Sequence, residues 1–194
     1  MKRSSTRTLV LYALFIGMVF LLGLTPVGLI PLGFINVTIL CIPVIVGTIV
    51  LGLKAGLLFG FFFGLASLMS VLGLSLVPPS VLAGVLLAAN PLFAIIMCFL
   101  PRMLVPVVTH CIYRLVSRGE RKKLSVVPAA VAGSLTNTIL YLGLMLFFYV
   151  LTGLDSTPVL AIIGGTGIIA GSTEAVTAAI IATPAVIALY RMEK

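Results

Sequence analysis

Two charged side chains stand inside long apolar segments of this chain, and their chemistry points most directly to function. Arg102 lies within one apolar stretch and Glu174 within another. A charge near the centre of a bilayer costs at least about 2.5–3.5 kcal/mol on insertion scales, so it persists where it is paired or used. The planar arginine fork matches a carboxylate in a bidentate geometry, and a glutamate can orient that fork or accept hydrogen bonds from a ligand.

Two hypotheses account for these charges. In the first, Arg102 and Glu174 neutralise each other as a structural pair, because buried charges usually need partners. In the second, Arg102 or the pair faces a water-accessible ligand site, because intramembrane ionisable residues are functional by default.

Asn137 adds a third polar group at a comparable depth. At about 1.5 Å of helical rise per residue, Arg102, Asn137 and Glu174 lie roughly 18, 21 and 25 Å from the basic residues at the inner ends of their segments. Thr138 follows Asn137 directly. A polar cavity open to the outside would hold all of them, although Asn137 alone could equally make an interhelical hydrogen bond.

The composition is that of an integral membrane protein. The 194 residues are 61% hydrophobic and only 8% charged, whereas a soluble domain is nearer a quarter charged. The net charge of +8 does not indicate a nucleic-acid ligand, because eleven of the twelve basic residues, all except Arg102, lie at the ends of apolar segments or between them. Their placement at alternate junctions follows the positive-inside rule.

Cutting the sequence at its polar and Pro/Gly breaks predicts six spans, since a helix needs about 20 apolar residues to cross a bilayer. We therefore expect an all-α fold: an integral membrane six-helix bundle with both termini cytoplasmic, forming a single transmembrane domain over residues 1–194. The predicted spans are residues 8–24, 37–53, 55–72, 91–116, 124–151 and 159–190.

Small residues recur at helical spacing in two of these spans. Gly56, Gly60 and Gly64 form a doubled GxxxG pattern that lets a neighbouring backbone approach closely, and we expect packing within the chain there. Ala13 and Gly17 have the same spacing on the first span. That face could pack internally or contact another subunit.

The outer connection over residues 25–36 has two prolines, two glycines and no charge. Its apolar side chains would rather be buried, while its turns restrict it. It could be a lid over an apolar pocket, with Phe34 and Asn36 contacting substrate, or a merely packed connector.

No catalytic machinery is apparent. The sequence has no nucleophile–base pair, no metal-ligand cluster and no phosphate-binding loop, so we expect neither an enzyme nor a metal or cofactor site in this chain. Its three cysteines, odd in number and without CxxC spacing, are expected to be free thiols.

Several segments resemble the substrate-binding S components of energy-coupling factor (ECF) vitamin transporters, and the resemblance covers nearly the whole chain. Its residues are Pro31-Leu32-Gly33, residues 38–47, Gly52-Leu53-Lys54-Ala55-Gly56, Pro101-Arg102, residues 133–138, and Glu174 with Pro184.

This resemblance implies a multi-pass protein of the bacterial cell membrane that captures a vitamin from outside. It would associate with a transmembrane coupling subunit and two cytoplasmic ATPases, which use the ATP. The Ala13/Gly17 face of the first span would meet the coupling subunit, and the first outer loop would close over substrate.

Pantothenate is the first choice of substrate. Arg102 would hold its carboxylate, Asn137 and Thr138 would bond to hydroxyl or amide groups, and Glu174 would orient Arg102 or accept from the ligand. An acidic residue associated with riboflavin binding is missing near the start of the second span, and Cys41 stands where similar sequences have histidine. The alternative is a self-contained, proton-coupled secondary transporter of a small carboxylate, with Glu174 as the proton site.

Overall fold

A computed structural model describes residues 5–31, 36–117 and 124–191 of the protein. In this part of the chain the fold is helical apart from one short hairpin. The elements are α1 (Ser5–Leu24), β1 (Leu29–Pro31), β2 (Asn36–Thr38), α2 (Cys41–Leu51), α3 (Leu53–Val71), α4 (Val81–Ala89), α5 (Pro91–Val116), α6 (Val126–Leu151), α7 (Thr157–Ile162), a π-helical turn η1 (Ile163–Gly167) and α8 (Ile168–Arg191).

Each predicted span corresponds to a helix, so the all-α expectation is confirmed. In the described part of the chain, four helices are long and apolar enough to cross a membrane, namely α3, α5, α6 and α8, and residues 8–24 and 41–51 form two shorter apolar helices. Helix α7, the turn η1 and helix α8 follow one another without a gap. Together they form the sixth predicted span.

Three local features differ from the predicted boundaries. The second helix begins at Cys41 and not at residue 37, because Asn36–Thr38 pair antiparallel with Leu29–Pro31. The outer stretch 73–90 contains a helix of its own, α4. The π-helical turn η1 interrupts the last span at a run containing three glycines, and π-helical turns commonly occur singly within longer α-helices.

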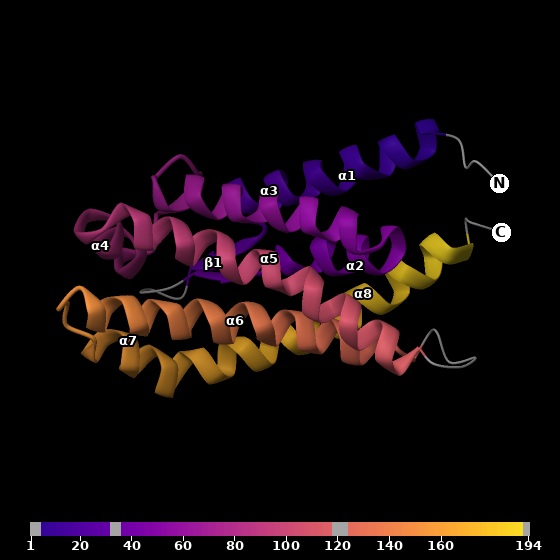
Figure 1. Ribbon diagram of the computed structural model, residues 1–194. Coiled ribbons are helices and arrows are strands. Elements are labelled where there is room, and N and C mark those ends of the chain that lie inside the picture. The colour runs from indigo at the N-terminus through magenta and orange to yellow at the C-terminus, as the bar shows by residue number, and fades with distance from the viewer. Residues whose placement is uncertain (1–4, 32–35, 118–123, 192–194) are drawn as a thin grey trace.

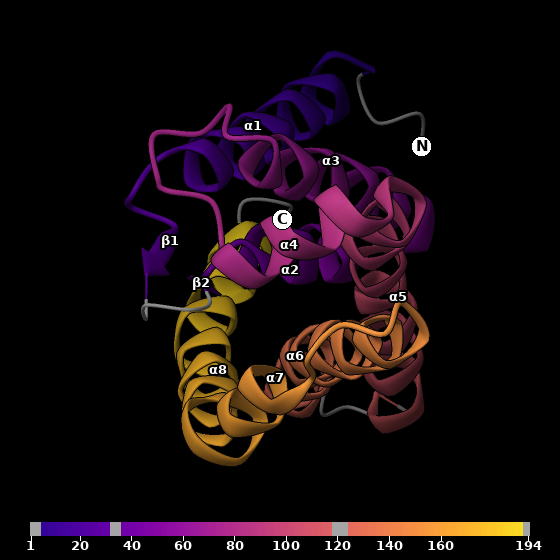
Figure 2. The same cartoon turned by 90° about the vertical axis from the view of Figure 1, so that its left-hand side faces the viewer.

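Both described chain ends lie at one end of the bundle, while the hairpin, α4 and α7 lie toward the other (Figure 1). This arrangement agrees with the topology predicted from the basic residues, and we call the end with α4 and α7 the outer end. Figure 2 looks onto that end and shows α8, α6 and α5 arranged around one side and α1 and α3 on the opposite side, with α2 between them.

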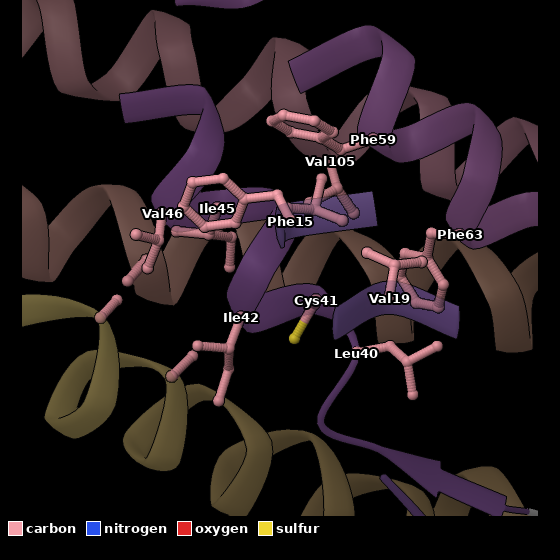
Figure 3. Close-up of a cluster of buried hydrophobic side chains, with 14 of the residues drawn as sticks. Phe15, Val19, Leu40, Cys41, Ile42, Ile45, Val46, Phe59, Phe63 and Val105 are labelled. Atoms are coloured by element: carbon pink, nitrogen blue, oxygen red, sulfur yellow. The ribbon is translucent and has the colours of Figure 1, made fainter. Parts of the chain in front are cut away.

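The short helix α2 is the centre of the core. Every residue from Cys41 to Ile49 is buried, and α2 packs against α3, α5, α6 and α8. Side chains from α1, α3 and α5 surround it, among them Phe15, Phe59 and Val105 near Ile45 (Figure 3). A helix that is apolar all round is stable when it is enclosed on all sides, which is how α2 is placed.

The glycines of α3 allow its close contact with α5. A methyl group built at Gly60 would lie 2.6 Å from the carbonyl oxygen of Arg102, and one at Gly64 would lie 2.7 Å from the Phe99 ring. The predicted packing of this GxxxG face within the chain is therefore confirmed. This packing also brings α3 into contact with the backbone of α5 at Arg102.

Candidate functional site

Two prolines in α5 determine how Arg102 is held. In a helix the carbonyl of residue 97 would accept from the N–H of residue 101, but Pro101 has no N–H. The Arg102 side chain takes this place, donating from Nη1 to the Met97 carbonyl oxygen at 2.9 Å. Pro106 likewise leaves the Arg102 carbonyl without its helical donor, at the position where Gly60 makes room for it. The local sequence therefore turns the guanidinium inward.

The Arg102 guanidinium lies between two aromatic rings. Its central carbon is 4.5 Å from the ring centroid of Tyr141 on α6 and 5.3 Å from that of Phe63 on α3. Cation–π contacts of this kind stabilise a desolvated cation by about 2 kcal/mol or more. They do not neutralise the charge, and the side chain is only 4% exposed. Its Nε is buried and has no hydrogen-bond partner within the described residues.

Glu174 belongs to a second polar group, formed between α2, α6 and α8. Thr138 Oγ1 donates to Glu174 Oε2 at 2.7 Å. One turn earlier on α6, the Ser134 hydroxyl lies 3.9 Å from the Cys41 sulfur. Gly171 lets α8 come close here, because a methyl group at this position would lie 3.2 Å from the Thr138 methyl carbon.

Helix α6 brings these two groups into the same layer. Tyr141, which contacts Arg102, and Thr138, which contacts Glu174, are three residues apart, or roughly 4.5 Å along the helix axis. Asn137 lies beside Thr138 and shares a helix face with Tyr141, four residues later. Asn137 is 3% exposed, and its buried Oδ1 has no partner in the described part of the chain.

The two charges do not form the structural pair that was one of the hypotheses. The hydrogen-bond partners that the structure gives them differ, Met97 for Arg102 and Thr138 for Glu174. Within the described ranges no ion pair joins the two side chains. The arrangement offers a buried cation and an unsatisfied amide oxygen, which together can bind an anionic group and a neighbouring hydrogen-bond donor.

A comparison with protein families identifies the kind of protein to which this site belongs. The family model described as "ECF transporter, substrate-specific component" matches residues 7–186. The chain belongs to this family. A search of curated proteins finds no match.

The protein is therefore the substrate-specific (S) component of an ECF transporter, a multi-pass membrane protein and not an enzyme. ECF S components pair with an energising module made of a T component and ATPases. The task of this chain within the transporter is therefore to recognise the substrate.

The structure places the other predicted residues of the S component as follows. Phe34 lies outside the described residues. Asn36 begins β2, where it pairs with Pro31, so the first outer connection is a hairpin at its described ends. Ala13 and Gly17 are both exposed on α1, and a methyl group at Gly17 would meet no atom within 4 Å. Among the described residues, the Ala13/Gly17 face is therefore not used for packing.

Several neighbours of Arg102 and Glu174 were not predicted from the sequence of the S component. Tyr141 could have been found, because it lies one helical turn after Asn137 on the same face. Phe63 carries no comparable signal, since an aromatic residue in an apolar span is ordinarily a packing residue. Ser134 and Cys41 lie in segments that carry the family resemblance, but nothing in the sequence shows that they lie together beside Glu174.

We expect the bond between Thr138 and Glu174 to stabilise the contact of α6 with α8. Replacing Thr138 with valine keeps the shape of the side chain but removes the donor to Glu174 Oε2. The loss should be about 1–3 kcal/mol, the usual result of removing one partner of a buried polar group. Thermal unfolding in detergent micelles measures it.

Thr136→Val is the matched control. The Thr136 hydroxyl donates only to the carbonyl of Ala132 in its own helix, so its removal should cost less. Equal loss in the two variants would show that the contact with Glu174 adds nothing to stability.

Proposed function

We propose that this S component binds a small vitamin or vitamin precursor that carries a carboxylate, with pantothenate as the first candidate, and captures it from the outside of the membrane. The observation that carries the proposal is the buried Arg102 guanidinium. It has a free Nε donor, and no carboxylate of the described residues pairs with it. A buried cation held by a carbonyl and two rings is stable when an anion arrives to balance it.

The neighbouring side chains suit the remainder of such a ligand. Asn137 Oδ1 needs a donor, which a ligand hydroxyl or amide N–H can provide. Thr138 already donates to Glu174, so we assign it a contact with Glu174 and not with the ligand. In this assignment Thr138 orients the Glu174 carboxylate, and Glu174 accepts from the ligand or orients its polar groups. The outer connection over residues 25–36, which contains Phe34 and Asn36, would close over the ligand.

Delivery would require the energising module, and the exposed face of α1 suits that contact. Ala13 and Gly17 are exposed and have no long side chains of their own, so another helix can approach closely at these two positions, between exposed apolar neighbours such as Leu14 and Met18. We assign this face to the transmembrane coupling subunit. The ATP would be used by the ATPases and not by this chain.

Isothermal titration of the purified protein against a panel of vitamins tests the proposed substrate class. We expect a carboxylate-bearing vitamin to bind with a Kd at or below about 10 μM, equivalent to roughly 7 kcal/mol of binding free energy. Pantothenol is the matched control ligand for pantothenate, because an alcohol replaces the carboxylate and the rest of the molecule is unchanged. Binding of neutral or cationic vitamins alone, or equal binding of pantothenate and pantothenol, would refute an anion-binding site at Arg102.

A further inference from the structure

The segment between α3 and α4, residues 72–80, has an unusual surface. We call it the α3–α4 connector. Its three leucines, Leu72, Leu74 and Leu76, are 52%, 64% and 77% exposed. Single exposed leucines are normal on proteins, but three alternate leucines on one short connector form an apolar edge that water solvates poorly.

Four backbone amides of the α3–α4 connector donate to carbonyls within the protein. The amides of Leu72, Gly73 and Leu74 donate to carbonyls of the last turn of α3, and the Leu76 amide donates to the carbonyl of Leu24 at the end of α1. The Ser75 hydroxyl donates to the Val77 carbonyl at 2.7 Å. Residues 78 and 79 are prolines and have no N–H. These bonds leave fewer backbone groups to be solvated where the connector lies at the membrane boundary.

The lengths of the helices place this edge at the level of the outer leaflet. Helix α3 has 19 residues, which span roughly 28 Å, and the hydrocarbon core of a bilayer is about 30 Å thick. With Lys54 at the inner boundary, Leu72 reaches the outer boundary. The bond from Leu76 to Leu24 keeps the connector at the end of α1, beside which it runs in Figure 2.

The α3–α4 connector continues an apolar surface of the bundle. Helices α1 and α3 expose large apolar side chains along their length, including Leu14, Met18, Leu58 and Phe61. The sequence between Lys54 and Arg102 contains no charged residue. The turn between α6 and α7, by contrast, carries the exposed Asp155 at the same end of the protein.

We propose that the α3–α4 connector is a lipid-binding edge, whose leucines insert among the acyl chains of the outer leaflet. The outer end of the protein is then asymmetric. Its α1–α3 side is held in the membrane, and the turn between α6 and α7 stands in water. This inference does not depend on which substrate is bound.

Tryptophan fluorescence tests the proposed lipid contact, because the natural chain contains no tryptophan. Leu76→Trp and Leu74→Trp place a single reporter on the connector. Phe61→Trp, midway along the exposed face of α3, is the lipid-facing control, and Asp155→Trp is the aqueous control. Each full-length variant is placed in lipid nanodiscs, with phospholipids brominated near the headgroup end of the acyl chains or with iodide in the buffer.

We expect brominated lipid to quench the two connector variants and iodide to leave them nearly unchanged, with the reverse result for Asp155→Trp. Quenching of both connector variants by iodide, as in Asp155→Trp, would overturn the inference and place the connector in water. Emission unaffected by either quencher would also overturn it, because a protein surface such as a second copy of the chain would then cover the connector.

Discussion

Replacing Arg102 with glutamine will weaken binding of a carboxylate ligand by about 1.5–3 kcal/mol, the range for hydrogen bonds to charged groups. This corresponds to roughly a 10- to 150-fold rise in Kd. The effect is expected to be large because the guanidinium is almost fully desolvated, so its attraction for an anion is weakly screened by water. Titration calorimetry of the variant, with the ligand identified from the vitamin panel, measures this change in Kd.

Arg102→Lys separates charge from geometry. Lysine keeps the positive charge but lacks the planar fork and the Nε donor. It also lacks the planar group whose central carbon contacts the rings of both Tyr141 and Phe63. We therefore expect partial recovery with lysine and none with glutamine.

The neutral ligand analogue provides the control for Arg102. The glutamine variant should bind pantothenol about as the natural protein does, because the lost interaction involves only the carboxylate. Thermal unfolding of each variant shows whether it is folded. A folded glutamine variant with unchanged affinity for the carboxylate would make Arg102 a purely structural residue.

The spans were predictable because bilayer thickness limits helix length. Helix α5 begins and ends where the sequence predicts, since Asn90 caps it, accepting from the amides of Leu92 and Phe93, and Pro91 occupies its first turn. The start of α2 was not predictable in this way. Val37 and Thr38 are β-branched, like much of the following helix, and their pairing with Leu29–Pro31 is a tertiary contact that no local pattern reveals.

The charged residues of the candidate site could be picked out from the sequence, and their contacts could not. Arg102 and Glu174 were identified because a charge in hydrocarbon is costly. Which side chain each one faces depends on the rotation of α5, α6 and α8 about their axes, which composition does not specify. Thr138 and Asn137 are neighbours in sequence, yet Thr138 bonds to Glu174, while Asn137 shares a face with Tyr141, the ring against Arg102.

Replacing Gly60 with alanine will destabilise the protein relative to a matched glycine replacement. The new methyl carbon would lie 2.6 Å from the Arg102 carbonyl oxygen, a backbone atom that cannot turn aside, so α3 and α5 must separate. Inserting a methyl group into packing of this kind costs about 1–3 kcal/mol. The gain in helix propensity from glycine to alanine, about 1 kcal/mol, opposes this cost.

Gly143→Ala on α6 isolates the clash, because it has the same gain in propensity and a methyl group there would meet nothing within 4 Å. We expect the Gly60 variant to unfold at a lower temperature than the Gly143 variant in detergent micelles, with a difference of about 1–3 kcal/mol. The Gly60 variant should also bind the carboxylate ligand more weakly, because the separation of α3 from α5 begins at the backbone of Arg102. Equal stability and equal affinity in the two variants would mean that α3 does not approach α5 this closely. The GxxxG face of α3 would then have no part in holding Arg102 in place.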